Sequence, residues 1–182
     1  MSLEVAALRA LAHPVRLQML SLLTGAAMSA AELARELHIT QANASYHLRK
    51  LSAAGEVVEA GDERIRGGVA KRYRYQWDDP PDYKGSSEQE QRLYVQAMAH
   101  QLVQRHLARK AATRRNLTDA ELWVEPEVWQ QVLGQVEAAS LALHRAARPV
   151  RSEGTIRVNM TAALFRMTDA PHAGRERDEN DA

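Results

Sequence analysis

The stretch between Thr40 and Gly55 carries side chains that can bind nucleic acid, and it contains no acidic residue. In the major groove of DNA, arginine pairs bidentately with guanine and asparagine or glutamine with adenine, whereas serine, tyrosine and lysine can hold phosphates. A solvated helix face without a ligand would be expected to carry acids as well. The residues that we predict to contact DNA are Gln41, Asn43, Ser45, Tyr46, His47, Arg49 and Lys50. Of these, His47 is also suited to a packing role.

A second group of cations lies in residues 64–74. Aromatic side chains alternate with arginines over residues 71–77, so a strand at this place would have one aromatic and one basic face. The cations suited to phosphate or minor-groove contact are Arg64, Arg66, Lys71, Arg72 and Arg74. Because Asp62 and Glu63 lie in the same segment, some of these cations could form surface ion pairs instead.

Two helices joined by a short turn are predicted to position the first group. Ser29 and Glu32 form a capping-box pattern at the start of a helix over about residues 30–38. Residues 38–40 form a turn, and a second helix runs from Thr40, a plausible N-cap, to a glycine that fits a left-handed C-cap. This spacing is typical of a helix-turn-helix motif, in which the second helix enters the major groove.

The flanking segments extend this motif. A helix over residues 3–12 precedes a second one that begins at Pro14 and ends at Gly25. After the motif, a strand over residues 56–60, a glycine-rich loop and a strand over residues 70–77 predict a β-hairpin. Helices followed by a helix-turn-helix motif and a hairpin make a winged helix.

Over about residues 5–77 the sequence resembles the ArsR family of bacterial winged-helix regulators. The similarity is carried by ALAHPVRLQMLSLL, by SAAELARELHITQANASYHLRKLSAAGEVVE and by GGVAKRYRY. It implies a dimeric repressor that blocks a promoter until a signal releases it. Family members often sense metals through cysteines, or through Asp, His and Glu residues on a C-terminal helix. This chain has no cysteine, and His100 and His106 lie about 240° apart around a helix. We therefore expect no metal regulation, with a site shared across a dimer as the open alternative.

The C-terminal half is predicted to dimerise and to sense an effector. A second capping box, at Ser87 and Glu90, opens a long helix over residues 88–115 that has apolar residues on nearly every side. We expect a homodimer through this helix and the N-terminal one, with contacts from Leu3, Val5, Leu8, Leu11, Tyr94, Val95, Met98 and Leu102.

A small α+β module is predicted after this helix. Residues 121–125 and 155–165 have strand patterns, and a helix that opens at Pro126 lies between them. Three aromatic residues could line a ligand pocket in this module, or they could simply be core: Trp123, Trp129 and Phe165. Residues 168–182 are charged, and we expect them to be disordered.

Composition limits the remaining classes. The 182 residues are 45% hydrophobic with a net charge of +1, no apolar run is long enough to span a membrane, and no basic signal-peptide start is present. We expect a cytoplasmic protein with no membrane partner, no cofactor and no catalytic site, since no phosphate loop, nucleophile elbow or metalloprotease motif occurs. The predicted division is 1–77 winged helix, 78–87 linker, 88–167 dimerisation and sensing, and 168–182 tail.

The predicted fold class is mainly α with a small β component. The predicted function is sequence-specific binding of a double-stranded operator by a dimeric repressor that answers to an unknown small-molecule or protein effector. Two other classes stay open. One is a winged-helix adaptor that binds a protein partner without reading DNA, and the other is an enzyme built on the C-terminal module.

Overall fold

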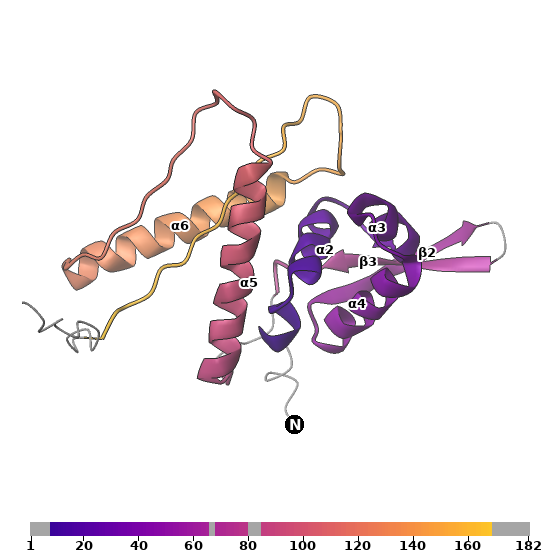
Figure 1. The fold of residues 1–182 in the computed structure, drawn as a ribbon, viewed down its shortest axis with the longest axis horizontal. Helices are drawn as coiled ribbons and strands as arrows, with labels where there is room; N and C mark the ends of the chain where they lie inside the picture. The colour runs from indigo at the N-terminus through magenta and orange to yellow at the C-terminus, as the bar shows by residue number, and fades with distance from the viewer. Residues whose placement is uncertain (1–7, 66–67, 80–84, 169–182) are drawn as a thin grey trace, which may run out of the picture.

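The computed structural model describes residues 8–65, 68–79 and 85–168 and is mainly helical (Figure 1). The described part contains a three-stranded antiparallel sheet with the strand order β1-β3-β2. In chain order the elements are α2 (Pro14–Gly25), β1 (Met28–Ser29), α3 (Ala30–Leu37), α4 (Gln41–Ala53), β2 (Val57–Ile65), β3 (Gly68–Tyr75), α5 (Glu88–Leu107) and α6 (Pro126–Ala146).

Local capping signals fix the helices of the N-terminal half. The predicted capping box is confirmed, because the Ser29 side chain accepts from the Glu32 amide while the Glu32 carboxylate accepts from the Ser29 amide at 2.7 Å. Thr40 caps α4 by accepting from the Asn43 amide at 3.2 Å. Gly55 follows α4 with φ of 76°, the left-handed conformation that was expected there. These caps satisfy amides that would otherwise lack partners, so α3 and α4 begin where the sequence indicates.

The hairpin is longer than predicted. β2 pairs with β3 from Val57 to Ile65, interrupted by a register shift between Glu59 and Asp62, and Ile65 lies opposite Gly68. The segment predicted as a loop, residues 61–69, is therefore largely strand. Gly61, with φ of 110°, lies at the register shift, where it absorbs a β-bulge without ending the strand. The prediction also missed β1, whose two residues pair with β3.

The core of the N-terminal half is aliphatic. Met19 and Leu23 of α2, Leu33 of α3 and Leu48 and Leu51 of α4 are fully buried in one cluster. Burying a side chain of this size contributes about 1.5–3 kcal/mol, so this cluster sets the packing of the three helices. The cluster also holds two residues from the helical turn before α2, Leu8 and Leu11.

The long helix α5 lies beside α2 (Figure 1) and ends at Leu107, well before the predicted end at residue 115. The next eight residues include four arginines or lysines. Like charges four residues apart, such as Lys110 and Arg114, destabilise a helix. Ala112 has a positive φ of 56°, which is incompatible with continuing the helix.

The predicted α+β module is not formed within the single chain. Residues 121–125 and 155–165 lie outside any helix or strand, and only α6 between them is regular. A strand is stable only when its backbone groups have partners, and the described part of the chain offers neither segment a neighbouring strand. No residue of α6 is buried.

Candidate nucleic-acid interface

The outer face of α4 gathers most of the residues predicted to contact DNA. Gln41, Asn43, Tyr46, Arg49 and Lys50 are exposed, and Ser45 is half-buried. The opposite side of α4 carries buried Ala44, Leu48 and Leu51, which hold the helix against the core. The helix therefore presents its polar and basic face outwards because its apolar face is committed to packing.

The side chains on this face are available for a ligand. Tyr46 is 47% exposed, and the Lys50 ammonium lies 5.8 Å from the centroid of its ring, a cation–π distance that keeps both groups on the same side of the helix. Among the described residues, Arg49 has no ion pair and no side-chain hydrogen bond. Its five N–H donors are free to form the bidentate pair that reads guanine.

His47 is the exception within the predicted set. It is only 5% exposed and points to the inner side of α4, where its ring lies 4.7 Å, centroid to centroid, from that of His13. Burial, the neighbouring His13 and Arg16 lower the pKa of His47 to about 4, so the ring is neutral near pH 7. In this structure the side chain packs against His13 and does not reach the outer face of α4, where its predicted contact with DNA would lie.

The cations of the hairpin are less free than predicted. Lys71 pairs with Glu59 at 2.7 Å, and Arg74 lies 3.8 Å from Asp78. Both pairs are exposed and screened by solvent, so phosphates could replace the carboxylates at little cost. Arg64 is exposed and has no ion pair within the described residues, whereas Arg66 lies outside them.

Arg72 has a different environment. Its guanidinium contacts Glu63, lies 3.1 Å from the Glu32 carboxylate and donates to the Ala27 carbonyl. The side chain is only 27% exposed. It therefore ties β3 to the start of α3, and these contacts leave its guanidinium less available to phosphate than predicted.

Some of the residues predicted for dimerisation are buried in the core of the chain, and others are exposed. Leu8 and Leu11 are core residues of the chain itself, so they are not free to contact a partner in this conformation, and Tyr94 packs against the same core. Val95 and Leu102 of α5 remain 52% and 38% exposed. Met98 is half-buried and lines a cavity, while Leu3 and Val5 lie outside the described residues.

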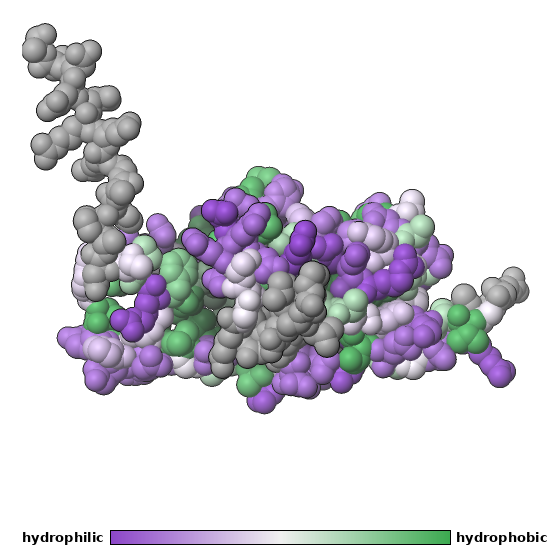
Figure 2. Space-filling model, turned by 90° about the horizontal axis from the view of Figure 1, so that it is seen from below, coloured by the Kyte–Doolittle hydropathy of each residue, from purple (hydrophilic) through white to green (hydrophobic). Residues whose placement is uncertain are grey.

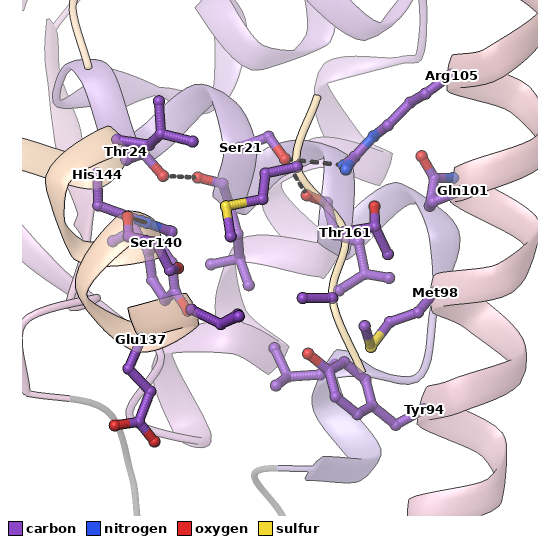
Figure 3. Close-up of a pocket in the computed structure, with 18 of the residues that line it drawn as sticks. Ser21, Thr24, Tyr94, Met98, Gln101, Arg105, Glu137, Ser140, His144 and Thr161 are labelled. Atoms are coloured by element: carbon purple, nitrogen blue, oxygen red, sulfur yellow. Dashed lines mark hydrogen bonds between the residues drawn. The ribbon is translucent and has the colours of Figure 1, made fainter. Parts of the chain in front are cut away.

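The predicted aromatic pocket does not form. Trp123 is 88% exposed, Phe165 is 64% exposed and Trp129 is half-buried. A cavity of about 450 Å³ lies instead between α2, α5, α6 and residues 160–164, and none of the three aromatic residues lines it (Figure 3). Sequence patterns missed this site because its walls come from elements far apart in the chain.

The described residues contain no group of three or more His, Cys, Asp or Glu side chains placed to hold a metal ion. They also contain no helix with the length and apolar character needed to cross a membrane.

Comparison with known proteins supports the reading of the N-terminal half. Residues 11–58, which span α2, α3, α4 and the start of β2, match a family described as a helix-turn-helix domain. A search of curated proteins gave no match to the chain. The chain thus carries a helix-turn-helix domain with a small antiparallel sheet, an architecture that indicates a DNA-binding regulator.

Proposed function

We propose that the protein is a sequence-specific, double-stranded DNA-binding transcription regulator that uses α4 as its recognition helix. The observation that carries the proposal is the outer face of α4, which is free of acids and presents Asn43, Tyr46, Arg49 and Lys50 to solvent. A helix-turn-helix domain places this helix in the major groove, where such side chains reach base edges. Arg64 at the hairpin is then positioned to contact an adjacent phosphate.

The regulator acts as a homodimer. Large apolar side chains are exposed along α5, along α6 and in the extended segments of the C-terminal half, and Figure 2 shows apolar side chains gathered on this side of the molecule. Isolated exposed apolar residues are normal, but an accumulation of this kind marks an interface. A second copy is the occupant we favour, because segments with strand patterns, such as residues 155–165, lack a neighbouring strand within the described part of the chain.

Two copies related by a two-fold axis would insert their α4 helices into successive major grooves, about 34 Å apart. The operator is then an inverted repeat with half-sites about one helical turn apart. The resemblance to the ArsR family favours repression by promoter occlusion. Regulation by a transition metal is not part of the proposal, because the chain has no thiol and no same-face histidine pair on α5.

The alternative function is that of a winged-helix adaptor that binds a protein through its exposed apolar surfaces. In the regulator α4 recognises a DNA sequence, whereas in the adaptor it does not. Selection of bound duplexes from a random pool, followed by genome-wide mapping of bound sites, separates them. The regulator predicts enrichment of one inverted repeat, and the enrichment should disappear with Arg49→Ala. An adaptor would enrich no sequence, and its weak DNA binding would be the same for all duplexes.

A further inference from the structure

The cavity between the two halves of the chain has the size and composition of a small-molecule site. Its volume of about 450 Å³ lies within the range of about 300–1,000 Å³ typical of ligand pockets. The walls are largely apolar and come from α2, α5, α6 and the C-terminal segment. The principal apolar contributors are Leu17, Leu20, Met98, Leu133, Val136 and Met160.

One cation lies at the edge of this apolar space. The Arg105 guanidinium reaches from α5 towards α2, where it donates to Ser21 Oγ at 3.0 Å (Figure 3). It also donates to Asn159 Oδ1 at 3.1 Å. Both partners are neutral, and Arg105 has no carboxylate partner within the described part of the chain. Burial and the nearby Arg157 lower the pKa of Arg105.

Among the described residues, the other charged side chain that lines the cavity belongs to Glu137. Figure 3 shows it on the side of the cavity opposite Arg105, with its carboxylate directed away. A partly buried arginine favours an anionic partner, because guanidinium binds carboxylate with two parallel hydrogen bonds. Both terminal nitrogens of Arg105 already donate a hydrogen bond to a neutral oxygen. The guanidinium has five N–H donors in total, so donors remain for a ligand.

We propose that this cavity binds a small organic carboxylate with an apolar body, whose carboxylate pairs with Arg105 and whose chain lies between Leu20, Met98 and Leu133. A neutral molecule of the same shape would bury the same apolar area but leave the guanidinium without a counter-charge. A cationic one would place like charges together. The site therefore selects its ligand by charge sign as well as by size.

The position of the cavity links it to the DNA-binding half. Ser21 and Thr24 on its wall belong to α2, the helix that packs against α3 and α4. Beyond α6, the chain passes so close to α2 that a Cβ on Gly25 would overlap the Arg148 backbone, and Arg151 pairs with Glu36 of α3 at 2.7 Å. A ligand that fixes α6 against α2 would thereby alter the spacing of the two recognition helices, an effect that rests on the proposed function.

Calorimetric titration of the full chain with octanoate, 1-octanol and octylammonium tests the site itself. We expect one octanoate per chain, bound at least about tenfold more tightly than octanol, because a hydrogen bond to a charged group is worth that much. Octylammonium should bind most weakly. Equal affinity for octanoate and octanol, or no binding of either, would overturn the proposal.

Variants test whether the preference for octanoate arises from Arg105 in the cavity. Arg105→Gln should bring octanoate down to the affinity of octanol, whereas Arg105→Lys should keep the preference for the anion. Arg92→Gln removes the same charge from an exposed position of α5 that does not line the cavity, so its affinities should stay at wild-type values. Ser140→Phe fills the space from α6 and should weaken both ligands alike. An anion preference that survives Arg105→Gln would contradict the assignment.

A DNA-binding measurement then tests whether ligand binding in the cavity changes the affinity for DNA. Anisotropy titrations of a labelled operator duplex, with and without saturating octanoate, should differ in affinity for wild type and agree for Arg105→Gln. Octanoate that binds without changing DNA affinity would refute the coupling and leave the site standing. A protein that binds octanoate but reads no DNA sequence would refute the proposed function instead.

Discussion

The imidazole rings of His13 and His47 lie 4.7 Å apart, centroid to centroid, at the junction of α2 and the inner face of α4. His13 caps α2 by accepting from the Val15 amide, so its ring is held at the start of that helix. His47 is nearly inaccessible to solvent, and its Nδ1 atom has no hydrogen-bond partner within the described residues. The packing of α4 on α2 thus involves two imidazoles in contact.

The first prediction is a loss of stability in mild acid. Burial and the adjacent His13 and Arg16 hold the pKa of His47 at about 4 in the folded protein, against 6.5 for an unperturbed histidine. Burial also lowers the pKa of His13. The unfolded chain therefore binds more protons between these values, and the free energy of unfolding should fall as pH drops from about 6.5 towards 4. Well above pH 6.5 both rings are neutral in the folded and in the unfolded chain, so there they should contribute no pH dependence.

Urea unfolding at a series of pH values measures this effect. His47→Phe keeps an aromatic ring of similar shape and cannot be protonated, so it should flatten the dependence in that window. The exposed His100→Phe on α5 serves as the control and should leave the dependence as it is in wild type. An unchanged slope in His47→Phe would show that the acid sensitivity arises elsewhere.

The second prediction concerns base readout by α4. Arg49→Ala should weaken operator binding by about 1–3 kcal/mol and relax the preference at particular base positions, because it removes a bidentate pair with guanine. Arg92→Ala on α5 removes a charge far along the chain from this face and should change neither quantity. Competition with single-substitution duplexes at fixed salt measures both effects. Full retention of base preference would mean that another face of α4 lies in the groove.

The helix-turn-helix part of the fold was predictable because its signals are local. The capping box at Ser29, the cap at Thr40 and the glycine at residue 55 each act within one helical turn, and all three recur in the structure. The exposed face of α4 followed from helical periodicity alone. Periodicity did not exclude His47, because this position lies at the border of that face, and its burial depends on the contact with His13 from a distant segment.

The C-terminal half was less predictable for a different physical reason. The alternation of residues 155–165 is a true strand pattern, but a pattern does not supply the partner whose backbone the strand needs. The cavity likewise depends on how α2, α5 and α6 meet, and its distinguishing residue, Arg105, reads in the sequence as one more surface arginine. The sequence also did not show that Arg72 forms ion pairs within the described part of the fold while Arg64 does not, because ion pairs with carboxylates far along the chain cannot be recognised from a sequence pattern.

The third prediction is that Arg72 contributes to stability and Arg64 to DNA binding. Arg72→Ala should lower the free energy of unfolding by about 1–3 kcal/mol, because it leaves the partly buried Glu32 without its cation. Arg64→Ala should leave stability unchanged within about 0.5 kcal/mol and should reduce the slope of log affinity against log salt by about one unit. Urea unfolding together with salt-dependent DNA titrations distinguishes the two. A wild-type stability for Arg72→Ala would contradict the structural role.

The last prediction is that α5 supports the homodimer through the side that the fold leaves open. Val95 and Leu102 lie seven residues apart, which places them on the same face of the helix, and both remain exposed. Val95→Glu should therefore convert a dimer at tens of micromolar into a monomer, since burying an unpaired carboxylate in an interface is strongly unfavourable. Gln96→Glu adds the same charge at the next exposed position and should stay dimeric.

Sedimentation equilibrium measures the mass of each variant. DNA titration should show that the Val95→Glu monomer binds a full inverted repeat no better than a single half-site. A monomeric wild type, or a Val95→Glu variant that sediments as a dimer, would place the partner on another surface, and α6 would be the next to test because none of its residues is buried.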